Sequence, residues 1–180
     1  LVKHLKIIIE DFTPKNPIID TLYYNQRKLD FSDFVTKPKK RLDDKSDFFK
    51  MAILTTFNYQ FETSMSADSL IVKLFSKVYQ VKNKSYISDI EKSEYNLKYL
   101  QSYFDLSNMM AEKFKYSIKK EKFEIETYKS AIDNIYTDIF TEYMEMKDEY
   151  ELKTNNGFNH EEQEERHKMI LEKTEEFKRK

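Results

Sequence analysis

Residues able to bind a metal gather near the C-terminus, where His160, Glu164 and His167 occupy positions i, i+4 and i+7 of one predicted helical face. Glu164 and His167 form an E-x-x-H pair, a spacing that helical di-iron proteins use for two of their ligands. Such a site needs a second E-x-x-H pair and two further glutamates, and His4 has no glutamate before it. The stretch HEEQE also departs from the H-E-x-x-H pattern of zinc proteases. We therefore expect a solvated, charged helix face and no metal site.

Two groups of basic residues are candidates for contacts with anions. The stretch KPKKR could serve as a nuclear import signal or bind phosphate, or it could be a solvated loop held by Asp43 and Asp44. The second group lies in a predicted helix and could meet anionic lipid. The first group comprises Lys37, Lys39, Lys40 and Arg41, and the second comprises Lys113, Lys115, Lys119, Lys120 and Lys122.

Signatures of catalysis are missing from the sequence. The chain has no cysteine, which excludes a thiol nucleophile and a cysteine metal site. Its single glycine, Gly157, cannot build a glycine-rich loop around a phosphate. Carboxylates are frequent, but none lies in an apolar stretch that would shift its pKa. We predict a protein that is not an enzyme, with no cofactor and no small-molecule substrate.

Composition favours helices and an intracellular location. One glycine and three prolines in 180 residues argue against a turn-rich sheet protein. No apolar run approaches the roughly 18 residues that a membrane span requires. The absence of cysteine suits the cytoplasm, with the nucleus as the alternative that KPKKR raises.

The two halves of the chain differ in charge. Residues 1–87 carry 15 basic and 10 acidic side chains (+5), and residues 88–180 carry 16 basic and 22 acidic ones (−6). Either the two halves complement each other in the folded chain, or the basic half meets an acidic partner.

Shorter helices are predicted before residue 88. Apolar residues from Leu1 to Phe12 recur at helical spacing, and TPKNP then interrupts the pattern. A second helix is predicted at 17–29, followed by a loop at 30–46. Helical spacing of apolar residues predicts two more helices, at 46–61 and 66–81.

A seven-residue apolar spacing dominates the second half of the chain. Ser88 and Glu91 match a capping box, and TNNG at 154–157 contains residues that end helices in the left-handed conformation. We predict one helix from about 88 to 154, with 105–108 (DLSN) as the weakest point. The seven-spaced residues are Ile90, Leu97, Phe104, Ala111, Ile118, Ile125, Ile132, Ile139 and Met146.

The predicted fold is all-α, an elongated helical bundle built on that long helix. Residues 1–157 form a helical domain, and 158–180 form a charged helical extension that returns along it and continues beyond the sequence. A helix of 67 residues is about 100 Å long, whereas a compact domain of this size is about 40 Å across. The apolar stripe would therefore need a cover, and a second copy of the chain is the simplest source.

We accordingly expect a structural or scaffolding module that binds protein, as a homodimer or with a partner helix, through the seven-spaced residues. The order of shorter helices, a very long helix, a tight turn and a returning helix over residues 46–180 resembles the three-helix plan of the curvature-binding BAR family. That resemblance implies a curved dimer whose lysines at 113–122 meet an anionic membrane. A second alternative is a helical nucleic-acid-associated domain that uses the basic half.

Overall fold

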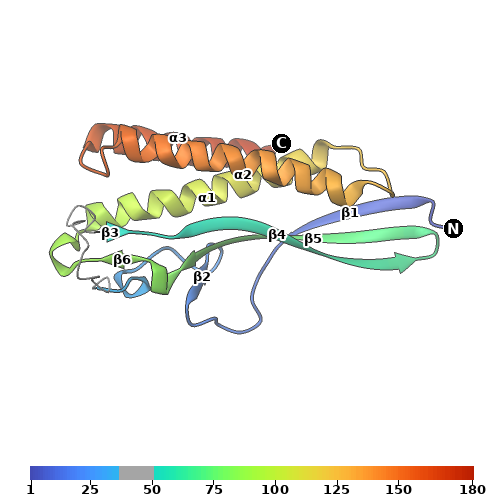
Figure 1. Ribbon diagram of the computed structural model, residues 1–180, viewed down its shortest axis with the longest axis horizontal. Helices are drawn as coiled ribbons and strands as arrows, with labels where there is room; N and C mark the ends of the chain where they lie inside the picture. The colour runs from blue at the N-terminus through green and yellow to red at the C-terminus, as the bar shows by residue number, and fades with distance from the viewer. Residues whose placement is uncertain (37–50) are drawn as a thin grey trace, which may run out of the picture.

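The computed structural model describes residues 1–36 and 51–180 and has a mixed α/β fold (Figure 1). The predicted all-α class is wrong, because a four-stranded mixed sheet and a small two-stranded sheet precede three packed helices. The strands are β1 (His4–Asp11), β2 (Thr21–Tyr23), β3 (Met51–Ala52), β4 (Thr55–Ser66), β5 (Ser69–Val81) and β6 (Tyr86–Ile87). The 3-10 helices are η1 (Phe31–Asp33), η2 (Lys82–Lys84) and η3 (Asp89–Glu91), and the α-helices are α1 (Glu94–Lys120), α2 (Tyr128–Lys153) and α3 (His160–Arg179).

Strand β5 is the centre of the larger sheet. Strand β4 pairs with it in antiparallel fashion along one edge, and the two form a long hairpin. On the other edge, β1 runs parallel to residues 69–76 and β2 runs antiparallel to residues 79–81. Strands β1 and β2 thus follow one another along the same side of β5. The small sheet consists of β3 and β6.

The strands form where side chains alternate between the core and the opposite face. On β4, Thr55 and Phe57 are buried, and on β5, Val72 and Leu74 are buried, two positions apart in each case. The spacing of Phe57 and Phe61 fits a helix as well as a strand, which explains the wrong helix predicted at 46–61. The β-branched and aromatic residues of the stretch TTFNYQFET, residues 55–63, favour a strand.

The β4–β5 hairpin turns without a glycine. Ala67 takes the left-handed conformation that a two-residue turn requires, with φ of 53°, and Asp68 completes the loop. The scarcity of glycine therefore does not exclude sheets in this chain, because alanine occupies the hairpin position where φ is positive.

The single helix predicted at about 88–154 is wrong, because residues 121–127 separate α1 from α2. The weak point at 105–108 lies within α1 and is buried. The linker is seven residues long, so it spans one heptad and leaves the seven-residue spacing unbroken. The helix also starts later than predicted, since Ser93 and not Ser88 accepts a hydrogen bond from a backbone amide of the first turn.

Helix α1 lies between the sheet on one side and α2 and α3 on the other (Figure 1). Residues 102–112 of α1 are buried without exception, as expected of a helix that is covered on all sides. With 27 residues, α1 is about 40 Å long, so the rod predicted from a 67-residue helix does not form. No helix in the described part of the chain combines the length and apolarity needed to cross a bilayer.

The predicted stop at TNNG is confirmed. Helix α2 ends at Lys153, and Asn155, Asn156 and Gly157 all take positive φ, at 48°, 54° and 89°. The turn is held to the start of α1, because Tyr95 Oη donates a hydrogen bond to the Gly157 carbonyl at 2.7 Å. Helix α3 then folds back along α1.

Candidate functional site

The seven-spaced apolar residues lie mostly inside the core of the chain itself. Helices α1 and α2 each present part of the set to the same core, because the linker reverses the chain between them. The stripe is therefore covered without a second copy, and the reason for expecting a rod-like dimer disappears. Phe104, Ala111, Ile118, Ile132 and Ile139 are buried, Leu97, Ile125 and Met146 are half-buried, and Ile90 is exposed.

The three residues proposed as a metal-binding face have separate partners. The ring of His160 stacks on Tyr95 with centroids 3.8 Å apart, and Glu164 accepts a hydrogen bond from Lys98 at 2.7 Å. His167 turns instead toward α1. Within the described residues, no group of three potential ligands is placed to hold a metal ion.

The basic residues of the predicted anion site are partly engaged in ion pairs. Lys113 pairs with Glu142, and Lys115 Nζ lies 2.7 Å from Asp11 Oδ1 and 2.8 Å from Glu112 Oε1. The pair with Asp11 ties the end of β1 to α1. Lys119, Lys120 and Lys122 are exposed, and Lys37, Lys39, Lys40 and Arg41 lie outside the described residues.

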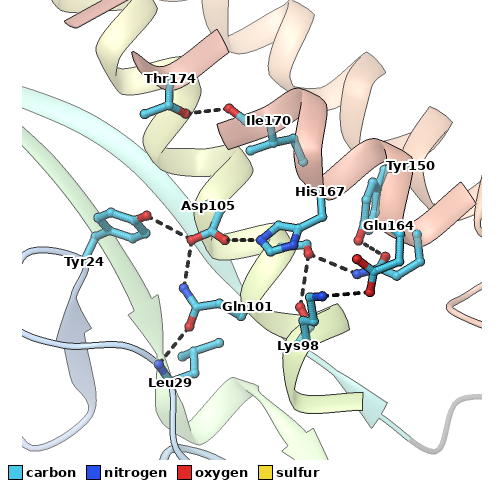
Figure 2. A network of polar contacts seen from close by, with 12 residues as sticks. Tyr24, Leu29, Lys98, Gln101, Asp105, Tyr150, Glu164, His167, Ile170 and Thr174 are labelled. Carbon is cyan, nitrogen blue, oxygen red and sulfur yellow. Dashed lines mark hydrogen bonds and ion pairs between the residues drawn. The ribbon is translucent and has the colours of Figure 1, made fainter. Parts of the chain in front are cut away.

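A polar network joins α1, α3 and the segment after β2 (Figure 2). Asp105 Oδ1 accepts hydrogen bonds from Tyr24 Oη and Gln101 Nε2, each at 2.9 Å, and Oδ2 lies 3.2 Å from His167 Nε2. Gln101 in turn accepts a bond from the Leu29 amide at 2.8 Å. Burial, reinforced by the charge of Asp105, raises the pKa of Tyr24, so its hydroxyl remains a donor. The network fixes three segments relative to one another.

A cavity of about 260 Å³ lies beside this network, where β1 leaves β5 and β2 arrives. Ser76 lines it, and its buried Oγ has no hydrogen-bond partner among the described residues. Asp11 and Glu112 also line the cavity, and Lys115 bridges their carboxylates. Burial lowers the pKa of Lys115, but the hydrogen bonds to both carboxylates raise it above its usual value. The charged groups of this cavity are thus satisfied within the chain.

Strand β1 has a partner on one side only, because β5 is its sole neighbour among the described strands. The amides of His4 and Phe12 bond to carbonyls of the β5 side, at Asp68 and Ser76. Alternate residues of a parallel strand direct their backbone groups to the partner, so the even-numbered residues face β5. The outward-pointing backbone groups belong to Leu5, Ile7, Ile9 and Asp11.

A groove of about 320 Å³ runs along this side of β1. The side chains of its odd-numbered residues lie on the helix side of the sheet, facing the C-terminal end of α1 and the linker. An extended segment in the groove can reach both the outward backbone groups of β1 and a hollow for its side chains, lined by apolar residues together with Lys119 and Glu121, which are the two requirements of strand addition. The lining residues are Leu5, Ile7, Ile9, Ile118, Lys119, Glu121 and Phe123.

The opposite edge of the sheet is partly covered. Tyr143 Oη donates a hydrogen bond to the Thr55 carbonyl at 2.9 Å, and Tyr136 Oη donates one to the Phe57 carbonyl at 3.1 Å. Helix α2 thereby occupies outward carbonyls at the start of β4, and such cover protects edge strands from pairing. Among the described residues, no side chain bonds in this way to the backbone of β1. We call the unpaired side of this strand, with the outward backbone groups of Leu5, Ile7, Ile9 and Asp11, the open edge of β1.

Comparison of the chain with protein-family models, with curated proteins and with solved structures finds no match. Inference about its function therefore depends on the geometry of the site.

Sequence reasoning misses the open edge of β1, because the spacing of Leu1, Leu5, Ile8, Ile9 and Phe12 also fits a helix. The run from Lys6 to Asp11, KIIIED, holds three consecutive β-branched residues between charges. That composition favours a short strand and is the one local signal for it.

Proposed function

We propose that this chain is a non-catalytic interaction module that binds an extended segment of protein along the open edge of β1. The observation that carries the proposal is the juxtaposition of outward backbone groups at Leu5, Ile7 and Ile9 with the groove beside them, which could hold the side chains of a bound segment. Strand addition uses such a pair of features, because the backbone supplies affinity and the groove supplies selectivity for side chains.

The placement of the apolar helix residues favours a strand edge, and not a helix, as the element that binds the partner. Phe104, Ile132 and Ile139 are buried between elements of the same chain. A partner helix would have to displace these contacts, whereas a partner strand at β1 displaces none of the sheet's own hydrogen bonds.

The polar network supports a role without catalysis. Asp105 and His167 contact each other, and the two buried serines of α1 nearby bond elsewhere. Ser102 Oγ donates to the Lys98 carbonyl at 3.1 Å, and Ser107 Oγ donates to Thr55 Oγ1 at 2.9 Å. No described hydroxyl is hydrogen-bonded to His167, so the network lacks the nucleophile–base contact that acyl transfer requires.

Peptide selection tests the proposal. A random peptide library displayed on phage is panned against the wild-type chain, Ile7→Pro and Ile7→Val. Proline removes the outward amide of Ile7 and leaves the β5 ladder intact, and valine keeps that amide. We expect peptides that bind the wild type and Ile7→Val and that lose at least tenfold in affinity for Ile7→Pro. Peptides that bind all three equally would contradict the proposal, as would the absence of any binding peptide if the chain is also monomeric.

The membrane-surface and nucleic-acid alternatives depend on basic residues, of which Lys113 and Lys115 are paired with acids of the chain itself. Co-sedimentation with anionic liposomes and filter binding of single-stranded RNA, each at two salt concentrations, test them. Binding that falls as salt rises and persists in Ile7→Pro would favour one of these alternatives over the strand-edge proposal.

A further inference from the structure

We infer that the segment bound at the open edge of β1 is the β1 strand of a second copy of this chain, in antiparallel orientation. This inference rests on the proposed function and adds the identity of the partner. It is carried by the charges of the strand and by the direction of its backbone groups, each of which is self-complementary.

The charges of β1 are segregated along its length. Lys3, His4 and Lys6 lie at its start, Glu10 and Asp11 lie at its end, and three isoleucines lie between. An antiparallel copy places the basic start of each strand beside the acidic end of the other, whereas a parallel copy would align like charges. The exposed side chains of Lys6 and Glu10 have no ion-pair partner among the described residues, so both are available for a pair across the interface.

The outward backbone groups restrict the register. In an antiparallel pair, two residues that exchange both hydrogen bonds must each point outward, so odd-numbered residues pair with odd-numbered ones. A register centred on Ile8 pairs Ile7 with Ile9 and Leu5 with Asp11, each twice by symmetry, which gives about eight backbone hydrogen bonds.

The same register also matches the side chains. On the face of the sheet away from the helices, it sets Lys6 opposite Glu10 twice and Ile8 opposite its own symmetry mate. On the helix side, each Ile7–Ile9 pair lies beside the groove. A register centred on Ile7 satisfies the backbone too, and it sets Lys3 opposite Asp11 and His4 opposite Glu10. It leaves Lys6 opposite Ile8, however, and it uses His4 and Asp11, which already pair with Asp68 and Lys115. The charges that lack a partner therefore favour the Ile8 register.

The resulting interface is closed. Both copies contribute the same strand about a two-fold axis, so each open edge is used once and the assembly ends at a dimer. The two four-stranded sheets become one continuous sheet with both helical layers on the same face. The covered start of β4 remains at each outer end.

Charge reversal tests the pairing of Lys6 with Glu10. Light scattering and sedimentation velocity compare the wild type with Lys6→Glu, Glu10→Lys and the double variant Lys6→Glu/Glu10→Lys. We expect a dimer for the wild type, at least a tenfold weaker dimer for each single variant, and recovery to within about threefold in the double variant. Lys84→Glu makes the same charge change on an exposed residue of η2 and should leave the dimer unchanged.

A disulfide tests the register. The chain has no cysteine, so single substitutions report on one position each. In the Ile8 register, the two copies of residue 8 face each other at a Cα separation of about 4.5 Å, within the range of a disulfide, whereas the two copies of residue 7 lie about 7–8 Å apart. We expect oxidised Ile8→Cys to form a covalent dimer and Ile7→Cys to form little covalent dimer, as read on a denaturing, non-reducing gel.

The experiments distinguish a wrong partner from a wrong function. A chain that is monomeric at all concentrations, single and double charge variants that behave alike, or a dimer that survives Ile7→Pro would each overturn the inference. If the peptide selection still yields ligands that depend on the Ile7 amide, the proposed function stands with a partner other than a second copy. If both experiments fail, the proposed function fails as well.

Discussion

His167 Nε2 lies 3.2 Å from Asp105 Oδ2, although the two residues are 62 positions apart in the sequence. Only 7% of the Asp105 side chain and 16% of the His167 side chain are exposed. The contact joins α3 to the centre of α1, and Tyr24 and Gln101 complete the hydrogen bonds of the carboxylate (Figure 2). Removal of this carboxylate would leave several buried donors without an acceptor.

We expect Asp105→Ala to lower the free energy of unfolding by about 3 kcal/mol, because Tyr24, Gln101 and His167 lose their common acceptor. Urea denaturation followed by circular dichroism measures the change. The matched control is Glu164→Ala, which removes a carboxylate from the exposed pair with Lys98 and should change stability little. Equal losses in the free energy of unfolding would show that the hydrogen bonds to Asp105 stabilise the fold no more than the exposed ion pair does.

A pH dependence of stability is expected from Asp33, which is fully buried with Arg27 at 2.7 Å and Lys82 at 3.2 Å. Burial raises the pKa of Asp33, but hydrogen bonds from Arg27, the Asp30 amide and Lys82 outweigh it and lower the pKa below its usual value. A group whose pKa falls on folding stabilises the protein above its unfolded pKa, near 3.9, and loses that contribution as the pH falls through the folded value. The free energy of unfolding should therefore decrease below about pH 4.

Denaturation curves of the wild type and Asp33→Asn between pH 2.5 and pH 7 check this dependence. The difference in stability between the two proteins should be largest near neutral pH and should shrink in acid. A difference that stays constant over the whole range would show that the Asp33 charge is not responsible.

Two buried serines, Ser76 in the cavity wall and Ser102 on α1, should respond in opposite ways to truncation. Ser76 Oγ has no partner among the described residues, so Ser76→Ala should leave stability unchanged or raise it by up to about 1 kcal/mol. Ser102 Oγ donates to the Lys98 carbonyl and accepts from Gln163, so Ser102→Ala should cost about 1–2 kcal/mol. Calorimetry of the two variants shows which one is more stable. A Ser102→Ala variant more stable than Ser76→Ala would be inconsistent with the structure.

Gly157 closes the turn between α2 and α3 and should tolerate no side chain. Its φ is 89°, and a Cβ there would lie 3.1 Å from the ring of Tyr99. We expect Gly157→Ala to lower the free energy of unfolding by about 1–3 kcal/mol in thermal unfolding. Asn155→Gly in the same turn also has positive φ but gains freedom, so it serves as the control that should cost little.

Proline substitutions should distinguish the two sides of β1. The Ile8 amide points to β5, so Ile8→Pro removes a ladder hydrogen bond and should cost about 3 kcal/mol or prevent folding. The Ile7 amide points outward, so Ile7→Pro should cost distinctly less when measured below the concentration at which the chain associates. Chemical denaturation of the two variants measures the difference, and equal losses would mean that the assigned direction of the backbone groups is wrong.

The helical half of the fold could be predicted in part from local signals. The positive-φ residues of TNNG mark the end of α2 in sequence and structure alike. The linker at 121–127 could not be predicted, because it contains no glycine or proline and keeps the seven-residue spacing of the apolar residues. Its weak signals are the lysines at 119 and 120, which suit a helix C-terminus, and the glutamates at 124 and 126 before the next helix.

The sheet could not be predicted from the spacing of apolar residues, because runs such as Leu70–Val81 carry apolar side chains on both faces of the strand. Pairing of β1 with β5 is a tertiary contact, and nothing local in HLKIIIED identifies a partner that begins at Ser69. The site follows from this pairing, since the direction of each backbone group is fixed only once β5 occupies one side. The open edge of β1 was therefore beyond reach of the sequence alone.

The ion pair between Asp11 and Lys115 links positions 104 residues apart, and β1 itself pairs with a strand far along the chain. During synthesis, the isoleucine-rich strand leaves the ribosome before β5 and α1, so it lacks its native partners until both have been made. Contacts of such long range slow folding, and an unpaired strand is prone to aggregation in the interval. Nascent chains should accordingly depend on chaperones until the distal half emerges.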